Sequence, residues 1–231
     1  MSNVNDSPIN RRAFLRMSAV AGCMAASGVW QPAAQAASEP DLSPDAALQK
    51  LLEGNQRFTQ HHPEYPDQTE ARLHEVAQAQ HPFVTILSCA DSRVPAEIVF
   101  DQGIGDIFDV RVAGNIVTPE SLGSIEYAVV LLKTPLLMVM GHERCGAVTA
   151  AVQQEALPGE IGSFVKAILP AVDRVKGETG DLVDNAVVAN VRYQIEQLQR
   201  SSLLTERVQS GQLKIVGGRY DLDTGSVTVV A

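Results

Sequence analysis

The chain has few aromatic residues, few cysteines and no long apolar run. Aromatic residues make up 5% of its 231 positions, and its three cysteines are Cys23, Cys89 and Cys145. So few cysteines exclude the class of small domains that rely on several disulfides instead of a core. None of the apolar runs reaches the ~20 residues of a membrane-spanning helix, so the sequence predicts no stable membrane anchor.

Basic residues are also scarce. The chain carries 18 Lys and Arg against 27 Asp and Glu, which gives a formal net charge of -9. Proteins that bind nucleic acid need a basic face against the phosphates, so nucleic acid is excluded as a partner. The hydrophobic content, by contrast, is 45%, which is enough for one domain with a substantial core.

The one strongly basic stretch lies near the N-terminus. Residues 11–16 read Arg-Arg-Ala-Phe-Leu-Arg, a weakly apolar run follows over residues 17–29, and a small-residue site ends at Ala36. This order is typical of a secretory signal, and the paired arginines resemble the twin-arginine export signal of bacteria. We therefore predict a signal peptide over residues 1–36, cleaved after Ala36.

Such a signal implies a partner and a location. The partner is the twin-arginine translocation machinery, which exports folded proteins, and the location is the periplasm or the medium of a bacterium. A transmembrane anchor is the first alternative, but the apolar run is too short for it. Lipidation of Cys23 is the second, and we rank it below simple cleavage because only six residues separate Arg16 from Cys23.

Cleavage would leave Cys89 and Cys145 as the remaining cysteines. In an oxidising compartment two cysteines often form a disulfide, and metal ligation is the other interpretation. A protein exported in the folded state can receive its metal in the reducing cytoplasm, and bound metal protects thiolates from oxidation. The metal interpretation therefore agrees with the predicted signal, while the disulfide stays open as an alternative.

The rest of the chain is predicted to form a leader and one domain. Residues 37–44 indicate a flexible leader, residues 45–231 the domain, and Ser43 is a candidate N-cap for an amphipathic helix of roughly 15 residues. Further helices are expected over 70–79, 121–133, 147–153, 161–176 and 180–208, and strands over 83–89, 106–112, 136–141, 213–220 and 226–230. This alternation predicts an α/β fold, a single domain with a central, mostly parallel sheet flanked by helices.

Three potential metal ligands follow two of the predicted strands. Cys89 ends the first core strand, His142 follows the strand over 136–141, and Cys145 comes three residues later. Open α/β sheets bind ligands beyond the carboxyl ends of their parallel strands. Two thiolates and an imidazole favour zinc, and a set of three protein ligands leaves the open position that is typical of catalytic zinc.

Asp91 and Arg93 lie two and four residues after Cys89. Arg93 can clamp Asp91 through a bidentate ion pair, which keeps the carboxylate ionised. Asp91 then either orients a zinc-bound hydroxide or ligates the zinc itself in an inactive state. Each short motif alone also fits a structural turn or a buried thiol, whereas both motifs at strand ends in one domain are far more specific.

Two segments resemble the signature segments of beta-class carbonic anhydrases. They are residues 88–95, Ser-Cys-Ala-Asp-Ser-Arg-Val-Pro, and residues 141–147, Gly-His-Glu-Arg-Cys-Gly-Ala. The resemblance runs from about Ala47 to the C-terminus and includes residues 54–58, 111–115 and 124–128. It implies reversible hydration of CO2 to bicarbonate and a proton by zinc-bound hydroxide.

The resemblance also implies site residues and an assembly. It assigns one Zn²⁺ per chain to Cys89, His142 and Cys145, and it makes Asp91 and Arg93 the catalytic pair.

In the same resemblance Gln80 matches a glutamine that reaches the neighbouring subunit's site, and Val94, Phe108 and Tyr127 match positions of the substrate pocket. A shared pocket implies a homodimer or homotetramer. One branch of the family inhibits itself through a tryptophan three residues before the first cysteine ligand, and Ile86 stands there in this chain. Although Arg111 of the same pocket is present, we expect the open branch, with Asp91 paired to Arg93 rather than to zinc.

Two further alternatives share the same ligands. The first is an enzyme that hydrolyses CO2-like molecules such as carbonyl sulfide or carbon disulfide, and the width of the pocket would decide between these substrates and CO2. A catalytically silent zinc-binding protein is the other alternative. The Asp91–Arg93 pair disfavours it, because a purely structural zinc site has no use for an oriented carboxylate.

Overall fold

The computed structural model describes residues 42–154 and 157–231. The predicted signal peptide, residues 1–36, and residues 37–41 of the predicted leader lie outside the described residues. Within the described ranges, no helix is both long and apolar enough to cross a membrane.

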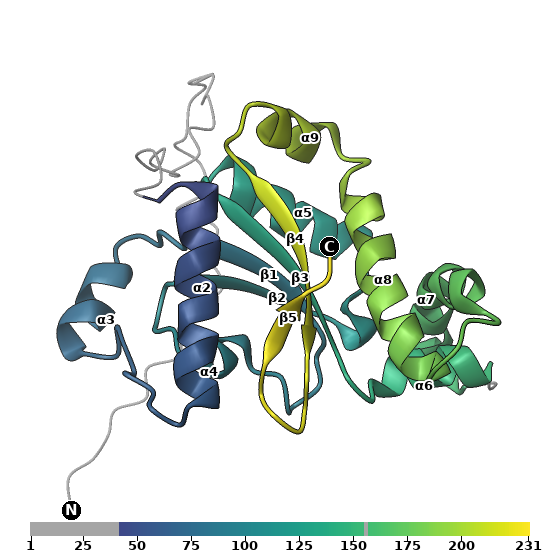
Figure 1. The fold of residues 1–231 in the computed structure, drawn as a ribbon. Helices are drawn as coiled ribbons and strands as arrows, with labels where there is room; N and C mark the ends of the chain where they lie inside the picture. The colour runs from purple at the N-terminus through teal and green to yellow at the C-terminus, as the bar shows by residue number, and fades with distance from the viewer. Residues whose placement is uncertain (1–41, 155–156) are drawn as a thin grey trace, which may run out of the picture. The chain divides into compact units, whose positions relative to one another are not determined.

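A five-stranded sheet forms the centre of the described part of the chain, in the order β2-β1-β3-β4-β5 (Figure 1). Its strands are β1 (Val84–Ser88), β2 (Ile107–Arg111), β3 (Leu136–His142), β4 (Lys214–Tyr220) and β5 (Val227–Val229). Neighbours among β1 to β4 pair in parallel, whereas β5 runs antiparallel to β4. The predicted single α/β domain with a mostly parallel sheet is confirmed.

Helices flank this sheet. They are α2 (Pro44–Thr59), α3 (Glu70–Val76), α4 (Ala96–Val99), α5 (Pro119–Val130), α6 (Gly146–Gln153), α7 (Gly162–Val175), α8 (Leu182–Leu198) and α9 (Ser202–Gln209), with short 3-10 turns η1 (Ala113–Asn115) and η2 (Gly159–Ile161). In Figure 1, α2 crosses in front of the sheet and α5 lies behind it.

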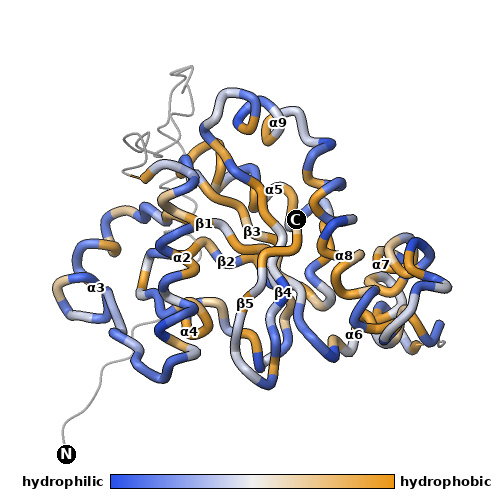
Figure 2. Tube along the Cα trace, viewed as in Figure 1, coloured by the Kyte–Doolittle hydropathy of each residue, from blue (hydrophilic) through white to orange (hydrophobic). Residues whose placement is uncertain are grey.

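The alternation of side chains along each strand builds a separate apolar layer on each face. Ile86 of β1 and Met138 of β3 pack with Leu51 of α2 on one face. Leu87 and Val139, the next residues of these strands, pack with α5, α8 and α9 on the other face. β1 and β3 are therefore buried on both faces along their whole length, and Figure 2 shows that their residues are mostly apolar.

A third apolar group lies where α6, α7 and α8 pack together. Val148 of α6, Ile168 of α7 and Val187 of α8 are buried in it, together with Cys89 and Cys145. These helices therefore shield the two sulfur atoms from water at the edge of the sheet where β1 and β3 end.

Local signals in the sequence account for most helix boundaries. The Ser43 hydroxyl accepts a hydrogen bond from the Ala46 amide at 3.3 Å, and α2 begins at Pro44. The single helix that we expected over 180–208 is wrong, because α8 ends at Leu198 and α9 begins at Ser202. Ser201 has an extended backbone and its hydroxyl caps α9, which interrupts the helix at this point.

Candidate metal centre

Neighbouring strands bring the predicted ligands together. β1 and β3 pair directly, with Ser88 opposite Met140, so their carboxyl ends meet at one edge of the sheet. Cys89 follows β1, His142 is the last residue of β3, and Cys145 stands at the N-cap of α6. Chain segments more than 50 residues apart thus meet because the parallel pairing aligns the strand ends.

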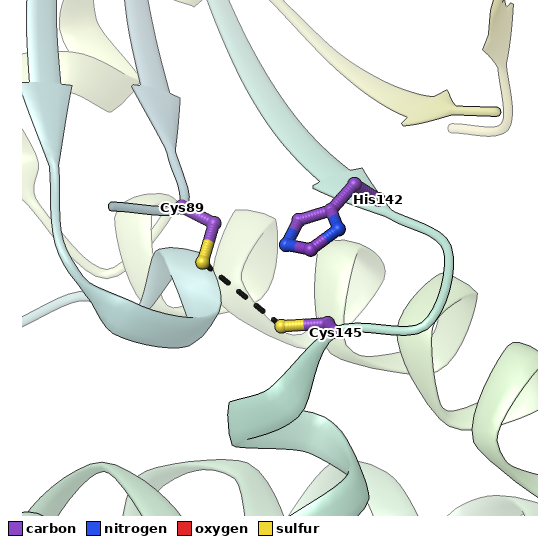
Figure 3. A group of neighbouring side chains, drawn as sticks. All are labelled: Cys89, His142 and Cys145. Carbon is purple, nitrogen blue, oxygen red and sulfur yellow. Dashed lines mark hydrogen bonds between the residues drawn. The ribbon is translucent and has the colours of Figure 1, made fainter. Parts of the chain in front are cut away.

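The geometry of this group suits a tetrahedral metal ion. The two sulfur atoms lie 4.0 Å apart, and one donor atom from each of the three residues lies within 4.8 Å of the others. Figure 3 shows both sulfur atoms and the imidazole ring turned toward a common point. Two thiolates, each ~2.3 Å from a tetrahedral zinc ion, would be about 3.8 Å apart, close to the separation observed here.

The imidazole of His142 is already oriented for ligation. Its Nδ1 donates to the Glu143 carbonyl at 2.8 Å, so Nε2 carries the free lone pair. This Nε2 is buried and has no hydrogen-bond partner among the described residues. A buried polar atom without a partner is costly, and a metal ion beside the two sulfur atoms would supply the missing partner. The residues present therefore fit zinc.

The two thiols differ in acidity. The pKa of Cys89 is lowered, chiefly because the Cys145 thiol donates a hydrogen bond to it, and the hydrogen bond from the Gly114 amide adds to this effect against the opposing effect of burial. The pKa of Cys145 is raised by this sharing with Cys89, by burial and by the nearby negative charge. A bound cation would replace the shared proton and stabilise both sulfur atoms as thiolates.

Asp91 lies beside the cluster and is clamped by Arg93. Arg93 donates from Nε to Oδ1 at 2.9 Å, from Nη2 to Oδ2 at 2.7 Å, and from its backbone amide to Oδ1 at 2.9 Å. These bonds hold the pKa of the Asp91 carboxyl well below its usual range. Oδ2 also lies 3.8 Å from Nε2 of His142, so an ionised carboxylate faces the point where the ligands converge.

Arg111 has a contact that the sequence did not predict. Its Nε donates to the Cys89 carbonyl at 3.1 Å and its Nη2 donates to the Asp91 carbonyl at 2.6 Å. One guanidinium group therefore fixes the loop that carries both a ligand and the carboxylate. No motif indicates this role, because both acceptors are backbone carbonyls, which the sequence does not distinguish.

The predicted pocket residues are not all placed at the cluster. Val94 is buried, and its amide donates to the Asp91 carbonyl at 3.1 Å. The rings of Phe108 and Tyr127 pack at 6.1 Å between centroids. Phe108, however, lies three residues before Arg111 on β2, which is about 10 Å along the strand from the ligand edge.

Gln80 is exposed and precedes the amino end of β1, whereas Cys89 follows its carboxyl end. Within one chain the structure therefore places Val94 in the turn that follows Asp91 and Arg93, with its side chain in the apolar cluster beneath α2, and leaves Gln80, Phe108 and Tyr127 elsewhere.

Comparisons with known proteins agree with this geometry. The sequence model of the family described as carbonic anhydrase matches residues 84–227. Carbonic anhydrase 2 of Mycobacterium tuberculosis is 42% identical over 80% of this chain and 92% of its own length. The solved beta-carbonic anhydrase CcaA is 27% identical, with a TM-score of 0.64, over 79% of this chain and 94% of that chain.

A tetrameric beta-carbonic anhydrase of the fungus Sordaria macrospora shares the fold. Its TM-score is 0.67 at 23% identity, over 80% of this chain and 96% of that chain. The family match covers more than half of the chain and includes both strands that carry the ligand cluster. The chain therefore belongs to the carbonic anhydrase family, in its beta class.

Proposed function

We propose that this carbonic anhydrase is a zinc enzyme that converts CO2 and water reversibly into bicarbonate and a proton. One zinc ion per chain would be held by Cys89, His142 and Cys145. The observation that carries the proposal is the convergence of two buried sulfur atoms and an imidazole nitrogen of His142 within 4.8 Å, where the buried Nε2 has no hydrogen-bond partner in the part of the chain that the structure describes. When bound there, zinc acts as a Lewis acid and makes water a nucleophile near neutral pH.

Asp91 orients the attacking water. Its carboxylate accepts a hydrogen bond from the water while Arg93 prevents it from rotating. Because the pKa of Asp91 is depressed, this residue stays ionised at neutral pH and does not store the proton that the reaction releases. The proton therefore passes to buffer by another route.

The substrate pocket would be shared between subunits of a homodimer or homotetramer. Tyr127 is 41% exposed and pairs with the half-buried Phe108, although neither lies at the ligand edge of its own chain. Gln80 is exposed as well. These three residues would line the partner's centre, with Val94 supplied by the chain that holds the metal.

The enzyme would be exported in the folded state to the periplasm or the medium. The support is the twin-arginine pattern at residues 11–16, followed by a small-residue site at Ala36. Replacement of Arg11 and Arg12 by Lys should retain the protein in the cytoplasm. Detection of the double variant in the periplasm at the level of the unaltered chain would contradict this route.

The experiment that tests the activity is stopped-flow CO2 hydration by residues 37–231 at pH 7 and 8.5, with zinc counted per chain. About one zinc per chain and activity at both pH values are the expected results. Activity at pH 8.5 alone would mean that Asp91 occupies the metal at lower pH despite Ile86. Full zinc without hydration would contradict the proposal, and turnover of carbonyl sulfide or carbon disulfide would then be measured.

A further inference from the structure

The sulfur of Cys89 accepts a hydrogen bond from a backbone amide of the turn η1. The Gly114 amide nitrogen lies 3.3 Å from this sulfur. Gly114 has φ of 73°, and a Cβ there would lie 2.6 Å from Ile168 Cδ1 and 3.1 Å from Ala147 Cβ. The turn η1 therefore needs glycine at this position to bring its amide against the ligand.

Two buried amide side chains of α8 hold this turn in place. The Nδ2 of Asn190 donates to the Gly114 carbonyl at 2.9 Å. Its Oδ1 accepts from Nε2 of Gln194 at 2.9 Å, and the Oε1 of Gln194 accepts from the Val117 amide at 2.9 Å. Both side chains are at most 1% exposed.

The backbone groups at the two ends set the orientation of both amides. The Val117 amide can only donate, so Gln194 must present its oxygen there and its nitrogen to Asn190. Asn190 must then present its nitrogen to the Gly114 carbonyl, which can only accept. The donors and acceptors of this network can therefore be arranged in only one way. The network bonds to the segment 114–117 at both of its ends.

Such a network is unusual on the buried face of α8, which is otherwise apolar. Val187, Val191 and Ile195 of α8 pack in apolar clusters. Burying two amides among them is costly unless every group is bonded, and apolar residues of similar size would avoid that cost. The Gly114 carbonyl and the Gly114 amide belong to different peptide groups, so the network acts by fixing position and not by polarising the donor.

We propose that Asn190 and Gln194 are positioning residues for the metal centre, which hold η1 against α8 so that the Gly114 amide donates to the Cys89 sulfur. Loss of a group that bonds directly to a metal ligand typically lowers metal affinity by about 10- to 100-fold. Asn190 acts one step further away, through the position of Gly114, so its loss should fall at the lower end of this range. The inference rests on the zinc site of the proposed function. It concerns residues of α8, a helix that supplies none of the proposed ligands.

The test uses Asn190→Leu, Gln194→Leu and the double variant in the mature chain, with zinc affinity measured by competition with a chelator. Replacement with Co²⁺ adds the sulfur-to-cobalt charge-transfer band as a readout of the thiolate ligands. Asn190→Leu should weaken zinc binding about 10-fold and shift this band. Gln197→Leu is the matched control, because the buried Gln197 amide nitrogen on the same helix has no partner among the described residues.

The double variant separates positioning from stability. Gln194→Leu alone leaves the Val117 amide and the Asn190 oxygen unpaired, and the double variant leaves the Val117 amide and the Gly114 carbonyl unpaired. Stability to urea should therefore be similar in the two variants, while zinc affinity should be lower in the double variant, because only that variant loses the bond to the Gly114 carbonyl.

Wild-type affinity and an unshifted cobalt band in the folded variants would overturn the inference, as would zinc affinities that follow the stability of each variant and not the loss of the Asn190 bond. Failure of the unaltered protein to bind zinc would instead contradict the proposed function.

Discussion

The Oδ2 atom of Asp91 lies 3.8 Å from Nε2 of His142 while it accepts a 2.7 Å hydrogen bond from Arg93. The same carboxylate thus faces the predicted metal ligands on one side and a guanidinium on the other. Because Arg93 engages both carboxylate oxygens, movement of Asp91 toward a metal would require the loss of this bidentate pair. In the proposed mechanism, this pair keeps Asp91 beside the attacking water and out of a ligand position.

Asp91→Asn should lower the rate of CO2 hydration by about 100-fold or more, because an amide is a weaker acceptor and is not held by the Arg93 ion pair. The zinc content should not change, since the three proposed ligands remain. Stopped-flow hydration with metal analysis measures both quantities. Asp173→Asn, which alters an exposed carboxylate paired with Lys176, is the control. Unimpaired hydration by Asp91→Asn would remove Asp91 from the mechanism.

Asp109→Asn should stabilise the fold near neutral pH. Burial, with a smaller effect from the Glu97 charge, raises the pKa of Asp109 from 3.8 to about 6, against opposing effects of Arg111 and Ser88. Between these values the folded protein binds more protons than the unfolded chain, so the unfolding free energy falls as pH rises. At pH 7.5 the variant should be more stable than the wild type by on the order of 2 kcal/mol.

Urea unfolding of both proteins at pH 4 and pH 7.5 checks this expectation. The advantage of the variant should nearly vanish at pH 4, where the carboxyl of Asp109 is protonated in the folded wild type. An equal difference between the two proteins at both pH values would mean that the effect is one of packing and not of proton linkage. Glu97→Gln should give a smaller gain, since Glu97 is the lesser cause of the shift.

Removal of the metal should expose the sulfur pair to oxidation. Cys89 and Cys145 lie 4.0 Å apart, and thiolates that hold a metal are protected from disulfide exchange. With oxidised glutathione, one thiolate forms a mixed disulfide, and the second thiol then displaces glutathione to close the Cys89–Cys145 bond. Thiol titration should therefore fall to zero in the chelated mature protein and stay at two in the zinc-loaded form. Retention of both thiols after chelation would contradict the expectation.

The ligand cluster could be predicted from the sequence because its residues lie at or just after the ends of two buried strands. Cys89 and His142 end apolar segments, and parallel pairing necessarily brings such ends to one edge. The break at Ser201 was missed because the apolar periodicity continues across it, and the capping hydroxyl acts only locally. The roles of Arg111 and Asn190 were also missed, since both side chains bond to backbone carbonyls, which every residue carries.

A shared pocket should appear as complementation between inactive chains. Gln80→Ala leaves the metal ligands intact, and Cys89→Ser removes a ligand but keeps Gln80. In a twofold dimer of these two chains, one of the two sites combines intact ligands with an intact Gln80. Random pairing of equal amounts should therefore restore about a quarter of the sites.

Co-expression and stopped-flow hydration measure this recovery, and light scattering measures the oligomer. The matched control pairs Asp91→Asn with Cys89→Ser. Asp91 and Cys89 lie at the same metal centre within one chain. Every site of that mixed dimer therefore contains one of the two substitutions, and no activity should return. Recovery in the first mixture alone would show that Gln80 serves the partner's centre. Recovery in neither, from a protein that is dimeric, would place Gln80 outside the partner's centre and confine the pocket to residues of one chain.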